Sequence, residues 1–329
     1  MTPSVFDRAL DLAVLPGYSR VGFALRGLSW DDAVARSLQG RTVLVTGGSA
    51  GLGEAACEGF ATAGASVHML VRDYDRGTQA VARIESRLPG ARAQIQLEVC
   101  DITDIAEVHR FAESFLAREP RLDVLVNNAG ALNQRREHTS DGIELTFATN
   151  VLGPFLLTGL LLPALTAAAP ARVITVSSGG MYTARLHPDD PQLERSKFDG
   201  PRFYAHAKRA EVVLNRVWSE HHAADEIAFH AMHPGWAKTA GLRASLPRFE
   251  RLLRPVLRDA RQGADTIVWL GSTPSLEPAS GGFWHDRSPR PEHRVRCTRD
   301  TAADRDRLWA ECERLSALPP RPPATAPKA

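Results

Sequence analysis

The sequence predicts an α/β fold, in which a single doubly wound parallel sheet has helices on both of its faces. Short runs of β-branched and other apolar residues alternate along the chain with segments of helical periodicity. The strand-like runs are almost wholly apolar, which is typical of parallel strands that are buried on both faces. The alternation continues without a break over 41–271, so the sequence indicates one such domain.

The first predicted strand is 41–46, RTVLVT, which ends at glycines and leads into a helix over 54–64. The later elements follow in the same alternation. Further strands are predicted at 66–72, 93–99, 122–128, 172–178 and 227–233, and further helices at 77–88, 105–119, 141–168, 203–222 and 261–271. The predicted regions are an N-terminal helical extension at 1–40, the main domain at 41–290, and a C-terminal helix with a disordered Pro/Ala-rich tail at 291–329.

Composition and charge argue against several classes of protein. The chain has 329 residues and a net charge of +2, which gives no reason to expect nucleic acid as a partner. Its four cysteines are scattered without metal-ligand or disulfide spacing, which suits a reducing cytoplasm. We find no run that approaches the roughly 18 apolar residues of a membrane helix. At 1–20, a helix packed on the domain is favoured over an amphipathic helix on a membrane surface.

Glycines follow the first predicted strand in the segment TGGSAGLG, Thr46–Gly53. Gly47, Gly51 and Gly53 allow a tight turn and let a phosphate approach the backbone without a Cβ in the way. The N-terminus of the next helix would direct unpaired N–H groups and a partial positive charge at the phosphates. A strand, a glycine-rich turn and a helix in this order predict a Rossmann-type dinucleotide site.

Residues at the ends of the next strands indicate which dinucleotide is bound. An acidic residue at the end of the second strand would accept hydrogen bonds from the adenosine ribose, but Val71 holds that place and Arg72 follows. A guanidinium can pair with a 2′-phosphate, which favours NADP(H) over NAD(H); a solvated loop arginine is the alternative. Asp101 is placed to accept a hydrogen bond from the adenine amino group. Asn128–Gly130 follow the fourth strand, where small residues and an amide can lie along the adenine ribose.

A tyrosine and a lysine stand four residues apart in RFYAHAKRA, at Tyr204 and Lys208. The chain has only four tyrosines and four lysines, so chance alone produces such a pair in about one chain in twenty. In a helix the two side chains lie on one face. The ammonium would favour the phenolate form of the tyrosine and so allow proton exchange near neutral pH. Two solvated side chains on a helix surface are the alternative.

The segments TGGSAGLG, NNAG, VSS, YAHAK and HPGWAKT occur in this order, and together they resemble the short-chain dehydrogenase/reductase family. The resemblance covers about residues 40–285 and is specific because all the segments agree in order. Within the family, RVITVSSGGM, FDG, HPGWA and QGADTIVWL look most like the dehydrogenase/reductase member twelve group. One departure is Ala50, where members that prefer NADP often carry a basic residue.

The resemblance implies roles for four catalytic residues. Tyr204 would be the general acid/base, and Lys208 would support it and bind the nicotinamide ribose. Ser178 would hydrogen-bond the substrate carbonyl oxygen. Asn150 would hold a water that links Lys208 to solvent. The cofactor-binding residues expected from the motifs and the resemblance are Thr46, Gly47, Ser49, Gly51, Leu52, Gly53, Arg72, Asp101, Ile102, Asn128, Ala129, Gly130, Tyr204, Lys208, Pro234, Gly235 and Thr239.

These residues lead us to expect a cytoplasmic enzyme that transfers hydride between NADP(H) and a carbonyl or secondary alcohol, without a metal. The stretch 240–260 has an apolar face where such enzymes carry a lid, which favours a lipophilic substrate; packing of a helix pair on the core is the alternative. Two other functions remain open: a nicotinamide-binding sensor or scaffold, and a nucleotide-sugar epimerase or dehydratase. The intact catalytic set argues against the first, and the short C-terminal part against the second. Family members often form dimers, so a homo-oligomer is an open expectation.

Overall fold

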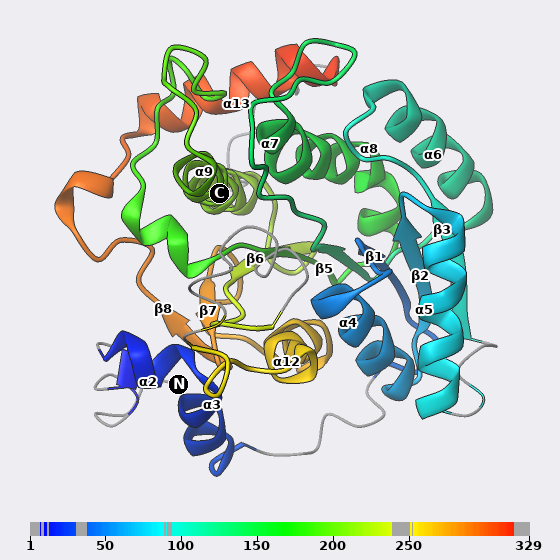
Figure 1. Cartoon of the computed structure of the whole chain (residues 1–329). Helices are drawn as coiled ribbons and strands as arrows, with labels where there is room; N and C mark the ends of the chain where they lie inside the picture. The colour runs from blue at the N-terminus through cyan, green and yellow to red at the C-terminus, as the bar shows by residue number, and fades with distance from the viewer. Residues whose placement is uncertain are drawn as a thin grey trace, which may run out of the picture.

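The computed structural model describes residues 7, 10, 11, 13–30, 38–88, 90, 94–238, 251 and 253–318. Their central feature is a sheet of eight strands in the order β3-β2-β1-β4-β5-β6-β7-β8 (Figure 1). All neighbouring strands are parallel except β7 and β8, which are antiparallel. The strands are β1 Thr42–Thr46, β2 Ser66–Val71, β3 Ile95–Val99, β4 Val124–Asn127, β5 Ala171–Val176, β6 Ile227–Met232, β7 Phe283–His285 and β8 Ser288–Arg290.

Helices cover both faces of this sheet, which confirms the predicted fold class. Figure 1 shows α4 and α12 on one face and α6, α8 and α9 on the other. The longer helices are α4 Gly51–Thr62, α5 Tyr74–Arg87, α6 Ile105–Arg118, α8 Gly153–Ala167, α9 Gly200–His221, α12 Ala260–Ser272 and α13 Ala302–Ser316. The shorter ones are α2 Val14–Tyr18, α3 Arg20–Gly27, α7 Leu145–Phe147 and the single turns η2 Ala148–Leu152, η3 Gly179–Thr183 and η4 Arg296–Thr298.

An apolar cluster on each face holds the helices to the sheet. Successive side chains of a strand point to opposite faces, so Val43 and Val45 belong to the cluster under α4 and α12, whereas Leu44 belongs to the other. This explains why the strands are continuously apolar. Phe60 from α4 and Phe155 from α8 are each fully buried in one of the clusters, and burial of such a side chain stabilises the fold by about 1.5–3 kcal/mol.

One helical segment corrects a prediction made from the sequence. We expected no stretch long and apolar enough to span a membrane, but Leu145–Ala167, 23 residues through α7, η2 and α8, is long and apolar enough by length and composition. In the fold, 72% of its apolar window is buried, and Phe155, Leu157 and Leu161 lie in the core. The composition of this segment is therefore that of a core helix.

The sequence patterns also missed the hairpin of β7 and β8. Each strand has only three residues, too few for a clear period of two. The connecting residues Asp286 and Arg287 have φ angles of 51° and 56°, the left-handed conformation of a two-residue type I′ hairpin. Asn-Gly or Asp-Gly is the usual signal for this turn, and Asp-Arg is not.

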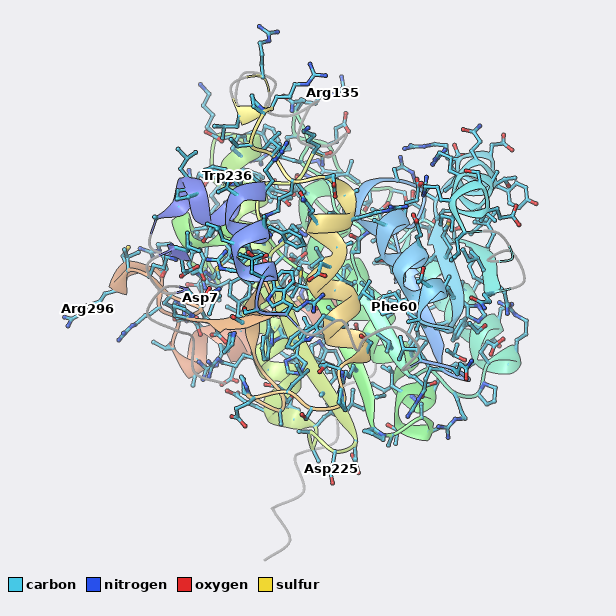
Figure 2. All side chains as sticks on the ribbon, turned by 90° about the horizontal axis from the view of Figure 1, so that it is seen from below. Asp7, Phe60, Arg135, Asp225, Trp236 and Arg296 are labelled. Atoms are coloured by element: carbon cyan, nitrogen blue, oxygen red, sulfur yellow. The ribbon has the colours of Figure 1, made fainter. Side chains whose placement is uncertain are left out.

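The N-terminal helices α2 and α3 pack beside this hairpin. Figure 2 shows Asp7 and Trp236 on the side of the molecule where α2 and α3 lie. The Trp236 N–H donates to the Tyr18 carbonyl (2.8 Å), and the Tyr18 ring lies 4.6 Å from the ring of His233 and 5.9 Å from that of Trp236, centroid to centroid. These are the contacts of a helix packed on the domain.

Buried ion pairs reinforce this attachment. Asp7 accepts hydrogen bonds from Arg26 Nε and Arg290 Nη1, both at 2.6 Å. Asp286 accepts from Arg26 Nη1 (2.6 Å) and Arg258 Nη2 (2.7 Å). All five side chains are buried, so each charge depends on its partners in place of water. The network joins the N-terminal helices to the hairpin and to the segment before α12.

Candidate active site

The predicted site residues lie mainly at the carboxyl ends of the parallel strands. Strand order reverses between β1 and β4, which pair directly. In open α/β sheets, ligands bind in the crevice outside the carboxyl ends of the strands at such a reversal. The loops after β1 and β4 lie at this reversal, and the loops after β5 and β6 follow along the same edge of the sheet.

The loops after β1 and β4 are hydrogen-bonded to each other. Thr46 Oγ1 accepts from the N–H groups of Asn128 and Ala129, both at 2.9 Å, and Asn128 Nδ2 donates to the Thr46 carbonyl (2.8 Å). The position of a Cβ on Gly47 would lie 2.9 Å from Ala129 Cα. Glycine is therefore required at Gly47, and Thr46 and Asn128 tie the two loops together.

The glycine-rich turn fits the phosphates of a dinucleotide. Gly47 and Gly51 have φ angles of 69° and 59°, a region that glycine enters without strain. A Cβ on Gly53 would collide with the Gly47 backbone. Ala50 precedes α4 and has no side-chain oxygen to cap its first N–H groups, so these donors are left for an anion.

Residues after β2 and β3 border the same edge. Arg72 is exposed, and its Nε lies 4.0 Å from Asp101 Oδ2. Asp101 Oδ1 accepts from both the N–H and the hydroxyl of Thr103, at 2.9 and 2.8 Å. Ile102 is buried. Arg72 is thus held only loosely and its guanidinium can turn toward a phosphate.

Tyr204 and Lys208 lie on one face of α9, as their spacing predicts. The helix begins after Asp199, whose side chain accepts from Arg202 N, with Pro201 in the first turn. The Lys208 ammonium lies 5.5 Å from the centroid of the Tyr204 ring. It is 2% exposed, so the pair is not a solvated patch on the helix surface.

Two acceptors hold the Lys208 ammonium. Nζ donates to the Val176 carbonyl at the end of β5 (3.0 Å) and to Glu211 Oε1 (2.7 Å). Burial disfavours its charge, but the Glu211 carboxylate and Tyr204 outweigh this effect and raise the pKa of Lys208 above its ordinary value. An ammonium has three donors, and the described residues occupy two of them, so one remains for a ligand.

Two serines follow β5 and have different contacts. Ser178 Oγ accepts from Gly180 N (3.2 Å) and so caps η3. A Cβ placed on Gly180 would lie 3.6 Å from Ser178 Oγ and 3.9 Å from Ala205 Cβ, so the turn that Ser178 caps lies against α9 at the residue after Tyr204. The Ser177 hydroxyl donates to the Lys208 carbonyl (2.8 Å) and is buried. Ser177 therefore joins α9 to β5, while Ser178 borders the site.

Asn150 is fully buried in the π-helical turn η2, a feature frequent at functional sites. Its Nδ2 donates to the carbonyls of Ala131 (2.9 Å) and Thr146 (2.7 Å). A Cβ on Gly130 would lie 2.9 Å from Asn150 Oδ1 and 3.3 Å from Lys208 Nζ. Gly130 thus lets Asn150 and Lys208 approach each other across the loop after β4.

The segment after β6 completes the described edge. Gly235 has a φ of 70°, and a Cβ there would meet the Arg258 guanidinium and the Tyr18 carbonyl. Pro234 is partly buried beside it. Thr239 and the predicted lid residues 240–250 and 252 lie outside the described residues, so their predicted roles stay predictions.

Sequence reasoning missed three contacts of this site. Arg83 donates to the Ser49 carbonyl (3.0 Å) and to Glu54 Oε2 (2.7 Å), so it holds the glycine-rich turn from α5. Ser177 anchors α9, and Glu211 binds Lys208. The only available signal was an acidic residue three positions after Lys208 in a helix, which is common.

The segment between Ser178 and Tyr204 contains acidic residues, and these have partners within the fold. Glu194 pairs with Arg136 (2.7 Å) and His138 (2.8 Å), and Asp190 accepts from the N–H groups of Glu194 and Arg195. Within the described residues, no three His, Cys, Asp or Glu side chains gather as metal ligands.

Comparison with known sequences identifies the class of protein. Residues 41–188 match the short chain dehydrogenase family model. The chain is 42% identical to dehydrogenase/reductase SDR family member 12 of Bos taurus, over 87% of this chain and 89% of that protein. It is 33% identical to retinol dehydrogenase 12 of Homo sapiens, over 84% of each. The chain belongs to the short-chain dehydrogenase/reductase family, whose members are oxidoreductases that bind NAD(P).

Solved structures show the same fold. A crystal structure of an uncharacterised protein from Mycobacterium paratuberculosis has a TM-score of 0.70 and 28% identity, covering 88% of this chain and 98% of that one. An NADP active-site complex of RhlG from Pseudomonas aeruginosa has a TM-score of 0.59 and 26% identity, covering 75% and 94%.

Proposed function

We propose that the protein transfers hydride between NADP(H) and a carbonyl or secondary alcohol. The observation that carries this proposal is the position of the Lys208 ammonium, buried near the Tyr204 ring and beside Gly130 and Asn150 at the carboxyl edge of the sheet. A buried cation close to a phenol, at the same edge of the sheet as a turn suited to phosphates, supports proton exchange at a nicotinamide site.

The proposed roles follow from the contacts of each side chain. When bound, the nicotinamide supplies or accepts the hydride. Tyr204 gives or takes the proton at its hydroxyl, and Lys208 stabilises the phenolate and uses its remaining donor for the ribose. Ser178 donates its hydroxyl proton to the substrate oxygen while its oxygen accepts from Gly180. Asn150 fixes the Ala131 backbone next to Lys208.

Arg72 supports NADP(H) as the cofactor. Its guanidinium is exposed at the end of β2 and its ion pair with Asp101 is long, so a 2′-phosphate meets little competition. The RhlG complex with NADP has a related fold. The lipophilic substrate and the cytoplasmic location remain predictions of the sequence; a relative named retinol dehydrogenase is consistent with the first.

The test is a panel of aldehydes, ketones and secondary alcohols, from short-chain to terpenoid and steroid-like, assayed with NADPH and NADH or their oxidised forms. We expect turnover with NADP(H), and higher kcat/KM for the lipophilic members. Better turnover with NADH would contradict the role of Arg72. A protein that binds the nucleotide but turns over nothing would point to the sensor or scaffold.

A further inference from the structure

A small cavity lies between α8, α9 and the strands β4 and β5. Its volume of about 20 Å³ is enough for one water molecule. Every residue that lines it is buried. Its polar wall consists of Asn127, Asn150, Thr158, Thr175, Glu211 and Asn215. Two of these residues connect the cavity to Lys208. Glu211 accepts a hydrogen bond from the Lys208 ammonium, and Asn150 lies beside it.

Three side-chain oxygens at this wall are buried and accept no hydrogen bond from the described residues: Asn127 Oδ1, Glu211 Oε2 and Asn215 Oδ1. Asn127 Nδ2 donates to Thr158 Oγ1 (2.9 Å), so Asn127 Oδ1 still needs a donor. A buried acceptor without a donor is costly. One water molecule has two O–H groups and can donate to two of the three oxygens. If Glu211 is protonated at Oε2, this oxygen becomes a donor and no longer needs one.

Among the described residues, few charged or titratable groups surround Glu211. On its own helix, Lys208 donates to Oε1 (2.7 Å), and the ammonium lies 5.5 Å from the centroid of the Tyr204 ring. From the end of β5 the Ser177 hydroxyl is nearby, and β4 and α8 present only neutral amides, hydroxyls and apolar side chains at the cavity. Burial outweighs the effects of Lys208 and Ser177 and raises the pKa of Glu211 to about 7.

We propose that this cavity binds one water molecule, and that Glu211, bonded to Lys208 through Oε1 and to this water through Oε2, is a positioning residue that sets the balance between phenol and phenolate at Tyr204. With Glu211 ionised, the ammonium is neutralised by its neighbour and stabilises the phenolate less. With Glu211 protonated, the full charge of Lys208 acts on Tyr204. The inference rests on the proposed role of Tyr204 and adds a group that tunes it.

The first experiment follows the Glu211 proton directly. Infrared spectroscopy of the protein detects the C=O stretch of a neutral buried carboxylic acid. We expect a band that titrates with a midpoint near 7 and that is absent in Glu211→Gln. If that variant does not fold, Glu211→Asp, which shifts the band, provides the assignment. The absence of any such band at or below neutral pH would overturn the proposal.

The second experiment measures the effect on Tyr204 by the ultraviolet absorbance of tyrosinate. The difference between each protein and its Tyr204→Phe counterpart isolates this residue from the other three tyrosines. We expect the midpoint of the Tyr204 titration to fall by about one pH unit in Glu211→Gln, a tenfold change in the equilibrium, and to stay near the original value in Glu211→Asp. A purely structural ion pair would leave the midpoint unchanged and overturn the proposal.

The third experiment locates the water. A high-resolution crystal structure should show one water within hydrogen-bond distance of Glu211 Oε2 and of at least one of the two asparagine oxygens; a dry cavity overturns this part. None of the three measurements needs a substrate or a nucleotide. Failure of the carbonyl panel would therefore leave them unchanged, and their failure would leave the proposed hydride transfer standing.

Discussion

At the scale of single residues, the site depends on small side chains as much as on reactive ones. Gly130 has no side chain, and a Cβ at this position would lie too close to both Asn150 Oδ1 and Lys208 Nζ. Lys208 in turn is fixed by Glu211 and by a strand carbonyl. The position of the ammonium is therefore decided by residues from three separate parts of the chain.

Gly130→Ala tests this dependence. The new Cβ would force Lys208 or Asn150 to move by a few tenths of an ångström, and misplacement of a catalytic group is costly. We expect kcat/KM to fall about tenfold or more, with the far-ultraviolet circular dichroism unchanged. Gly27→Ala is the matched control, because a Cβ there meets only the Trp30 ring at 3.7 Å, an ordinary contact. Equal activity of the two variants would contradict the account.

At the scale of elements, the N-terminal helices are attached through the β7–β8 hairpin. Asp286 occupies the first position of its turn and pairs with Arg26 and Arg258, all buried. Arg287, the second position, pairs with Asp265 (2.6 Å) and its guanidinium lies 4.3 Å from the centroid of the Trp30 ring. These side-chain contacts hold a left-handed conformation that arginine does not favour.

Asp286→Asn removes the charge while keeping a side chain that tolerates the left-handed region. Two buried guanidinium groups would lose their shared carboxylate, so we expect the free energy of unfolding to drop by about 3–5 kcal/mol. Asp265→Asn, which breaks the less buried pair with Arg287, should cost less, because water reaches both of its side chains. Urea unfolding measures both, and similar losses in the two variants would refute the distinction.

At the scale of the whole molecule, several buried histidines are kept neutral. Burial lowers the pKa of His206 and His230 to about 3 and those of His233 and His285 well below the ordinary value of 6.5. In the unfolded chain they would take up protons as the pH falls through 6.5. Their contribution to stability is thus present above pH 6.5 and lost below it.

We expect each of these histidines to reduce the free energy of unfolding by up to about 1.4 kcal/mol per pH unit below 6.5. Glu211 has the opposite sign, because its raised pKa of about 7 gives the folded state an extra proton, so it offsets one of the four. Urea unfolding as a function of pH measures the slope. His206→Gln should reduce it, and stability that is flat between pH 7 and 5 would contradict the account.

The sheet, its helices and the main site motifs could be predicted because they depend on local signals. Apolar runs marked the strands from β1 to β6, and Gly47, Gly51 and Gly53 marked the phosphate turn. Other features depend on tertiary contacts that no local pattern carries. Burial, which no local pattern reveals, raises the pKa of the Glu211 carboxyl. The β7–β8 hairpin was missed because its turn, Asp286-Arg287, is not a usual turn sequence. The helix predicted at 141–168 is present, but its stretch Leu145–Ala167 is more apolar than expected, because most of it is buried in the core.

The central claim is that Tyr204 exchanges the proton with the substrate at a nicotinamide site. The most direct test measures NADPH affinity and turnover for the wild type, Tyr204→Phe and, as a control, Tyr74→Phe, which changes an exposed tyrosine. We predict that Tyr204→Phe lowers kcat by about 10²–10⁴-fold while the Kd for NADPH changes less than about threefold, and that Tyr74→Phe has no effect. Turnover by Tyr204→Phe at the wild-type rate would contradict the claim.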